Sequence, residues 1–249
     1  MSKADLRRRV WNLLIEKGVS RFPGAVGRIP NFVGAEGAAR LLSTLPSWER
    51  VQICKCNPDA PQGPVRYLAL ASGKTVFMAV PRLRTERCFL ELDAKGIQGS
   101  LRQAASIRGA SREGRPVRVT EVVPLDLILC GSVAVNRAGA RVGKGGGYSD
   151  IEFALLIASG KVSPATLIVT TVHPLQIVSE EIEMQVHDIP VDLIITPEEV
   201  VETRTRYPRP WGICWDLLPA EKIAAIPVLD RLRRDRSSGI SEGGGWTAP

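Results

Sequence analysis

The spacing of apolar residues along the chain predicts alternating helices and strands. Between residues 3 and 17, Leu6, Val10, Leu13 and Leu14 form an apolar stripe, and the opposite face is basic. This is the pattern of an amphipathic helix, which Gly18 ends. Consecutive apolar and β-branched residues, as in 166–172, instead indicate a buried strand. The same patterns predict helices over 35–45, 65–72, 100–109 and 151–158, and strands over 50–56, 75–80, 89–92, 126–130 and 191–196.

This alternation predicts an α/β fold, in which a mainly parallel sheet is covered by helices on both faces. We expect a hairpin over 133–142, a rigid proline-rich loop over 57–64 and a basic loop over 109–118. A chain of 249 residues, 44% of them hydrophobic, is long enough for one large domain or two small ones, and we assign residues 1–235 to a single domain. The glycine- and serine-rich tail, 236–249, is expected to be disordered.

The composition narrows the choice of partners. The chain has 33 basic and 26 acidic residues, a net charge of +7, which suits nucleic acid or a pocket for polyanionic small molecules. No RNA-binding motif is visible and only 5% of the residues are aromatic, so an RNA-binding module is the least favoured hypothesis. The N-terminus is too charged for a secretory signal and no run of about 18 apolar residues occurs, so we expect a cytoplasmic protein without a membrane partner.

Residues 143–150 are the most informative segment of the chain. Four glycines and Lys144 occupy its first five positions, Tyr148 and Asp150 follow, and a helix is predicted directly afterwards. Glycine lets a backbone approach a ligand closely, and a helix N-terminus presents amide donors to an anion, so the segment suits a nucleotide phosphate. Lys144 would add a positive charge, and Asp150 is suited to Mg²⁺. The spacing matches neither a Walker loop nor a dinucleotide fingerprint, so by itself the segment fits a flexible turn equally well.

Several motifs occur in a fixed order along the chain. They are the runs from Lys3 to Arg7, from Gly73 to Val76 with Pro81-Arg82 after it, from Val123 to Leu129, from Ala134 to Asp150 and from His187 to Thr196. Together they resemble the 5-formyltetrahydrofolate cyclo-ligase family, also called methenyltetrahydrofolate synthetase, over about residues 3–200. The resemblance implies a three-layer α/β/α fold with a mainly parallel sheet (NagB/RpiA/CoA-transferase-like).

The resemblance also implies a reaction that uses ATP and Mg²⁺. ATP phosphorylates the formyl oxygen of 5-formyltetrahydrofolate, a neighbouring folate nitrogen attacks, and phosphate leaves as the 5,10-methenyl ring closes. Such phosphoryl transfer depends on positioning and charge neutralisation. Cofactors and partners implied are therefore ATP, Mg²⁺ and a folate derivative.

The resemblance assigns roles to individual residues by position. Lys3 and Arg7 match the lysine and arginine that meet the ATP phosphates, and Asp150 and Asp188 match two Mg²⁺ carboxylates. Without the resemblance, these four would be a solvated basic helix face, a helix-start acid and a turn residue. The residues that match the nucleotide loop are Arg141, Gly143, Lys144, Gly145, Gly146, Gly147, Tyr148 and Ser149, and the catalytic candidates among them are Arg141, Lys144 and Tyr148. His187 is expected to be a structural neighbour of Asp188 rather than a general base.

The chain departs from the family pattern mainly in its folate half. Ser149 stands where the family has a second tyrosine, and 109–116 replaces a Gly-Ile-x-Glu-Pro-like element. The Glu-Val-x-Thr-like segment that grips the folate is missing, and Gln62 is the residue expected nearest to its glutamate. These departures resemble a divergent branch, the methenyltetrahydrofolate synthetase domain-containing proteins. The principal hypothesis is therefore a 5-formyltetrahydrofolate cyclo-ligase, and the alternative is an ATP-binding protein of the same fold that acts on a different acceptor.

Overall fold

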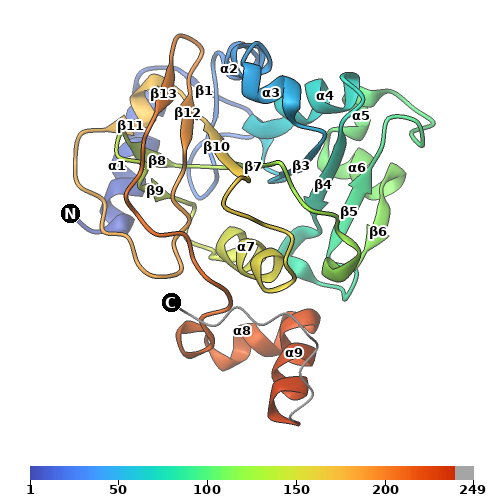
Figure 1. Ribbon diagram of the computed structural model, residues 1–249. Coiled ribbons are helices and arrows are strands. Elements are labelled where there is room, and N and C mark those ends of the chain that lie inside the picture. The colour runs from blue at the N-terminus through green and yellow to red at the C-terminus, as the bar shows by residue number, and fades with distance from the viewer. Residues whose placement is uncertain (239–249) are drawn as a thin grey trace.

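The computed structural model describes residues 1–238, and its centre is an eight-stranded sheet (Figure 1). The strands in spatial order are β13 (Val200–Glu202), β12 (Leu193–Ile195), β10 (Leu167–Thr171), β7 (Leu127–Cys130), β3 (Ile53–Cys56), β4 (Thr75–Ala79), β5 (Phe89–Leu92) and β6 (Arg115–Val117). From β12 to β4 every neighbouring pair is parallel, whereas the pairs at the two edges are antiparallel. The predicted mainly parallel sheet is therefore confirmed.

Successive residues of the central strands enter two separate apolar cores. In β7, Ile128 and Cys130 pack in the core that contains α7 (Tyr148–Ala158), whereas Leu127 and Leu129 pack in the core on the opposite face. This alternation follows from the two-residue period of a strand. The helices of the opposite face are α2 (Ala35–Ser43), α3 (Pro46–Arg50), α4 (Gly63–Ala71), α5 (Leu101–Ala104) and α6 (Ile107–Glu113). Helices thus cover both faces of the sheet, and the predicted three-layer α/β/α arrangement is confirmed.

A smaller sheet carries the N-terminal helix. Helix α1 (Lys3–Glu16) buries its Leu6, Val10 and Leu14 against the predicted hairpin. The strands of this sheet are β8 (Ala134–Asn136), β9 (Arg141–Val142) and β11 (Ile177–Val178), and a separate ribbon joins β1 (Ser20–Arg21) to β2 (Asn31–Phe32). Because β9 leads directly into the glycine-rich segment, this packing brings the start of α1 close to that segment.

Two helices near the C-terminus were not predicted from the sequence. Helices α8 (Ala220–Ala224) and α9 (Pro227–Ser237) lie beside α7 at the lower edge of the molecule in Figure 1. Their Ile223, Ile226 and Leu229 join the core of α7. The prediction of a disordered tail from residue 236 is wrong for its first residues, because α9 continues to Ser237. Residues 239–249 lie outside the described part of the chain.

Other predictions need correction at their boundaries. The segment 109–118 is not a loop, because α6 runs to Glu113 and β6 pairs with β5, with Ala110 and Val117 buried. The helix predicted over 100–109 is two helices, and the strand predicted over 50–56 begins only at Ile53, since α3 occupies Pro46–Arg50. The proline-rich loop contains a short 3₁₀ turn, Ala60–Gln62, before α4. Within residues 1–238, every helix is too short or too polar to cross a membrane.

Candidate functional site

The glycine-rich segment borders a cavity of about 710 Å³. Asn57, Val80 and Gly131, which directly follow β3, β4 and β7, line the same cavity. The cavity therefore lies at the carboxyl ends of the parallel strands, where ligands of open α/β sheets bind. All of the predicted site residues line it: Lys3, Arg7, Arg141, Gly143, Lys144, Gly145, Gly146, Gly147, Tyr148, Ser149, Asp150 and Asp188.

The glycine-rich segment turns sharply into α7. Gly145 and Gly147 have φ angles of 95° and 68°, a left-handed conformation that glycine adopts without steric cost. Gly147 is the N-cap of α7, and within residues 1–238 no side-chain hydrogen bond caps the first helical turn. These amides and the positive end of the helix dipole are suited to an anion. Ser149, in the same turn, has a buried hydroxyl without a hydrogen-bond partner among the described residues.

Cationic side chains from distant parts of the chain contact this segment. Arg7 of α1 donates from Nε to the carbonyl oxygen of Gly143, at 2.7 Å, and its guanidinium lies against Gly145. Lys144 Nζ donates to Asp59 Oδ1 at 2.8 Å. Burial lowers the pKa of the Arg7 guanidinium, an effect opposed by Asp188 and Asp150. The arrangement concentrates positive charge beside free amides, which is what a polyphosphate requires.

The buried Arg141 and the partly buried Asp150 form an ion pair at the end of the cavity nearest to β9. Arg141, only 4% exposed, donates to the carbonyl oxygen of Gly131 and to Asp150 Oδ1, each at 2.9 Å. Burial raises the pKa of the Asp150 carboxyl; Arg141 opposes this effect, and the charge of Asp188 adds to it. Asp188 is paired with Lys3 and also accepts from the backbone amide of Gln185 at 2.6 Å. The two acids are thus close enough to influence each other electrostatically.

Asp150 and Asp188 fit the chemistry of a Mg²⁺ site. Hydrogen bonds from the described residues reach only one oxygen of each carboxylate, Asp150 Oδ1 and Asp188 Oδ2. Over residues 1–238, no group of three or more His, Cys, Asp or Glu side chains is arranged to hold a metal. Two carboxylates, completed by phosphate oxygens and water, are the usual protein share of a Mg²⁺ site. His187 Nε2 lies 4.0 Å from Asp188 Oδ1, which agrees with its expected place as a neighbour of that acid.

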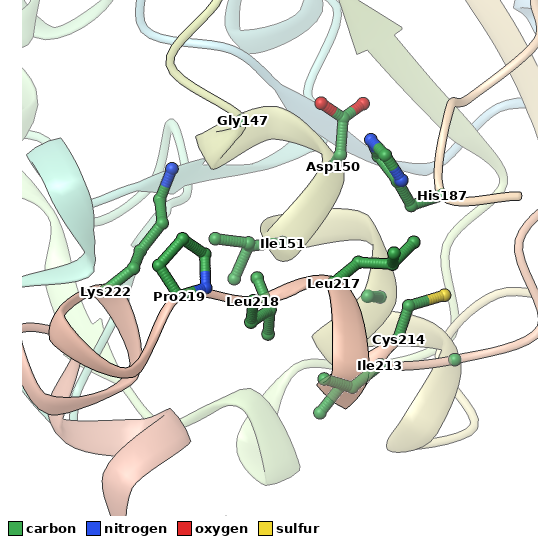
Figure 2. A pocket seen from close by; sticks show the side chains of 12 residues that line it. Gly147, Asp150, Ile151, His187, Ile213, Cys214, Leu217, Leu218, Pro219 and Lys222 are labelled. Carbon is green, nitrogen blue, oxygen red and sulfur yellow. The ribbon is translucent and has the colours of Figure 1, made fainter. Parts of the chain in front are cut away.

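Lys222 reaches the glycine-rich segment from α8, and the sequence analysis missed it. Its Nζ donates to the carbonyl oxygen of Gly146 and lies 4.7 Å from the centre of the Tyr148 ring. Figure 2 shows Lys222 on one side of the first turn of α7 and Asp150 with His187 on the other. Burial lowers the pKa of the Lys222 ammonium, and Asp150 opposes this shift. No sequence signal could have found this contact, because α8 itself was not predicted.

Replacing Lys222 with methionine is expected to weaken the binding of ATP, the cofactor that the family resemblance implies, about fivefold, or roughly 1 kcal/mol. The reason is that an ammonium group that holds the glycine-rich segment and faces the Tyr148 ring is removed. Titration calorimetry with ATP and Mg²⁺ measures this change. Arg233→Met is the matched control, since Arg233 is an exposed cation of α9. Equal ATP affinity in Lys222→Met and Arg233→Met would contradict the prediction.

Comparison with known proteins identifies the family. The model of the 5-formyltetrahydrofolate cyclo-ligase family matches residues 1–197. The chain belongs to this family. The match ends before α8 and α9, so Lys222 comes from a segment beyond the family model.

Curated relatives carry the name methenyltetrahydrofolate synthase domain-containing protein. The chain is 38% identical to the relative from Bos taurus, 39% to that from Mus musculus and 38% to that from Homo sapiens, over 94%, 96% and 96% of its length. These matches are longer than 197 residues, so the similarity continues into the C-terminal segment. The chain spans only 62% to 65% of the length of these relatives.

A solved structure confirms the fold. The NMR structure of the Aquifex aeolicus 5,10-methenyltetrahydrofolate synthetase superimposes with a TM-score of 0.54, covering 84% of this chain and 96% of that protein. At 22% sequence identity this likeness establishes the α/β architecture alone. The roles of individual site residues remain predictions.

Proposed function

We propose that this protein is an ATP- and Mg²⁺-dependent cyclo-ligase that converts 5-formyltetrahydrofolate into 5,10-methenyltetrahydrofolate. One observation carries the proposal: the cationic, glycine and carboxylate residues that match the family's nucleotide site meet in one cavity at the carboxyl ends of the parallel strands. These residues come from α1, β9, the start of α7 and the segment before β12, which are distant in sequence. Their convergence supports a single polyphosphate site.

Charge neutralisation is the main task of the chain's own residues. The free amides at the start of α7 and the side chains of Arg7 and Lys144 bind phosphate oxygens. Lys3 pairs with Asp188, and Lys144 pairs with Asp59. Asp150 and Asp188 would hold Mg²⁺. The bound ion would further neutralise the charge of the transferring phosphoryl group. Once these acids bind a cation, Lys3 becomes available to a phosphate oxygen.

The acceptor must lie with its formyl oxygen in line with the terminal phosphate. The formyl oxygen takes the phosphoryl group from ATP and ADP remains; the neighbouring folate nitrogen then forms the new C–N bond, and inorganic phosphate carries the formyl oxygen away. Arg141 is placed to stabilise negative charge at the end of the cavity, because its guanidinium is buried and fixed by Gly131 and Asp150. Buried, preorganised cations of this kind need no reorientation during the reaction.

The reaction is tested by incubating the protein with 5-formyltetrahydrofolate, ATP and Mg²⁺ and following methenyltetrahydrofolate by its absorbance. We expect product only when all three are present, and we expect removal of Mg²⁺ with EDTA to abolish the reaction and added Mg²⁺ to restore it. Equal product without ATP, or activity that survives chelation, would contradict the proposal.

A second candidate function is ATP-dependent chemistry on a different acceptor. The observation that favours it concerns Gln62, the residue expected nearest to the missing folate glutamate. Gln62 is fully buried, does not line the cavity, and neither atom of its amide has a hydrogen-bond partner among the described residues. This burial supports a site without the folate contact that the family's glutamate makes. Calorimetry with 5-formyltetrahydrofolate separates the two functions, since the second requires ATP binding without folate binding.

A further inference from the structure

A polar cluster that includes none of the predicted site residues lies at the wall of the cavity. It consists of Lys55 on β3, Asn57 directly after β3, and Glu152 on α7, which are 1%, 4% and 4% exposed. Lys55 Nζ pairs with Glu152 Oε2 and donates to Asn57 Oδ1 at 3.3 Å. Asn57 and Glu152 line the cavity, and Arg66 fixes the backbone of Asn57 by donating to its carbonyl oxygen.

Packing alone does not account for this cluster. Lys55 lies between Cys54 and Cys56 on a buried strand, and Glu152 lies between Ile151 and Phe153 on a buried helix. Removing two charges from water costs several kcal/mol per ion, and apolar residues of similar volume are often as stable or more stable in such positions. A buried ion pair that borders a ligand cavity is therefore better explained by what it contacts in the cavity.

The hydrogen bonds of the cluster leave one donor and one acceptor available. An ammonium group only donates hydrogen bonds, so the side-chain oxygen of Asn57 is assigned to the atom that accepts from Lys55. The side-chain nitrogen of Asn57 is therefore not used in this contact. No described residue contributes a hydrogen bond to Asn57 Nδ2 or to Glu152 Oε1. The cluster thus offers an amide donor and a carboxylate acceptor on two residues that both line the cavity. These groups complement a ligand edge that carries a carbonyl oxygen beside an N–H group.

We propose that Lys55, Asn57 and Glu152 form the recognition site for the acceptor, binding the edge of a flat heterocycle that presents adjacent carbonyl and N–H groups. This inference rests on the proposed function, because the pyrimidine ring of a reduced folate has such an edge. Glu152 accepts from the ring N–H, Asn57 donates to the ring carbonyl, and Lys55 holds both side chains in place. Asp150 and Glu152 both line the same cavity, so the ring and the phosphates occupy one continuous space.

The test measures the binding of separate halves of the folate by calorimetry. The probes are 5-formyltetrahydrofolate, a tetrahydropterin that carries only the ring system, and 4-aminobenzoylglutamate that carries only the tail. In Glu152→Gln and in Asn57→Ala, we expect the affinity for 5-formyltetrahydrofolate and for the tetrahydropterin to fall at least tenfold. Affinity for ATP with Mg²⁺ and for 4-aminobenzoylglutamate should stay within twofold of the wild type.

Matched controls separate recognition from structure. Glu91→Gln removes a carboxylate that also pairs with a cation, Arg115, but that does not line the cavity, and it should leave all affinities unchanged. Asn57→Ala keeps the ion pair between Lys55 and Glu152, so this variant alone tests the recognition of the ring if Glu152→Gln does not fold. A wild-type protein that binds folate while folded variants bind the tetrahydropterin equally well would overturn this inference alone. A wild-type protein that binds ATP but no folate would overturn the proposed function as well.

Discussion

Replacing Asp150 with asparagine is expected to lower ATP-dependent product formation by at least about 100-fold, the usual cost of removing one preorganised electrostatic group from an active site. Asp150 is both the ion-pair partner of the buried Arg141 and one of the two carboxylates proposed to hold Mg²⁺. Asparagine keeps the shape of the side chain but removes its charge, so Mg²⁺ would lose one of its two proposed carboxylate ligands. The initial rate at saturating ATP, measured over a range of Mg²⁺ concentrations, gives the size of the effect.

The change at Asp150 also affects stability, and this effect must be measured separately. Arg141 is left as a buried cation without its carboxylate, which lowers the free energy of unfolding. Rates are therefore compared per folded protein, with the folded fraction taken from thermal denaturation. Asp216→Asn is the control, because Asp216 is an exposed acid of the C-terminal segment. Full activity of folded Asp150→Asn would exclude the proposed metal site.

Replacing Lys55 with methionine is expected to lower the free energy of unfolding by about 3–5 kcal/mol, because it leaves the Glu152 carboxylate buried without a counterion. Burial already raises the pKa of the Glu152 carboxyl, and Lys55 is the main group that opposes this shift. Without Lys55 the folded-state pKa rises further above its unfolded value. Guanidinium denaturation of the variant and the wild type gives the difference in stability.

The pH dependence of the Lys55→Met variant has a definite sign. A carboxyl group with a raised folded-state pKa takes up a proton more readily when the protein is folded, so its contribution is favourable at low pH and is lost as the pH rises through the folded-state pKa. The loss in the free energy of unfolding of the variant, relative to the wild type, should therefore be smaller at about pH 5 than at about pH 8. Lys55→Met combined with Glu152→Leu should recover most of the stability. A loss of stability that is the same at both pH values would show that the unpaired Glu152 carboxylate is not its cause.

Much of the fold was predictable because burial leaves a clear pattern in the sequence. The stripe of Leu6, Val10 and Leu14 predicted α1, and the apolar runs predicted β7 and β10, since both faces of these strands are covered. Segments that mix charges with a few buried residues were not predictable. Helix α9 is strongly basic and is anchored mainly by Val228 and Leu229, so its polar residues conceal its contact with the core.

Site residues that lie together in one segment were predictable from the sequence. Site residues that only tertiary packing brings together were not. The glycine-rich segment and Asp150 are contiguous in the sequence, so the glycine motif and the start of the following helix could be recognised together. Lys222 and Asp59 contact this segment only through tertiary packing. Glu152 offered one signal that was overlooked: it is a charged residue within an otherwise apolar helix, a position that requires a buried partner.

The C-terminal helices show that the core extends beyond the part of the chain that the family model covers. The family model stops at residue 197, yet Val201, Ile213, Ile226 and Leu229 pack in the same core as Phe153 and Leu155 of α7. A chain cut at residue 197 would leave this flank of α7 open to water and would release the Gly146 carbonyl from Lys222. The border of the family model therefore crosses the middle of a structural unit, and trimming this protein at that border would disturb the glycine-rich segment.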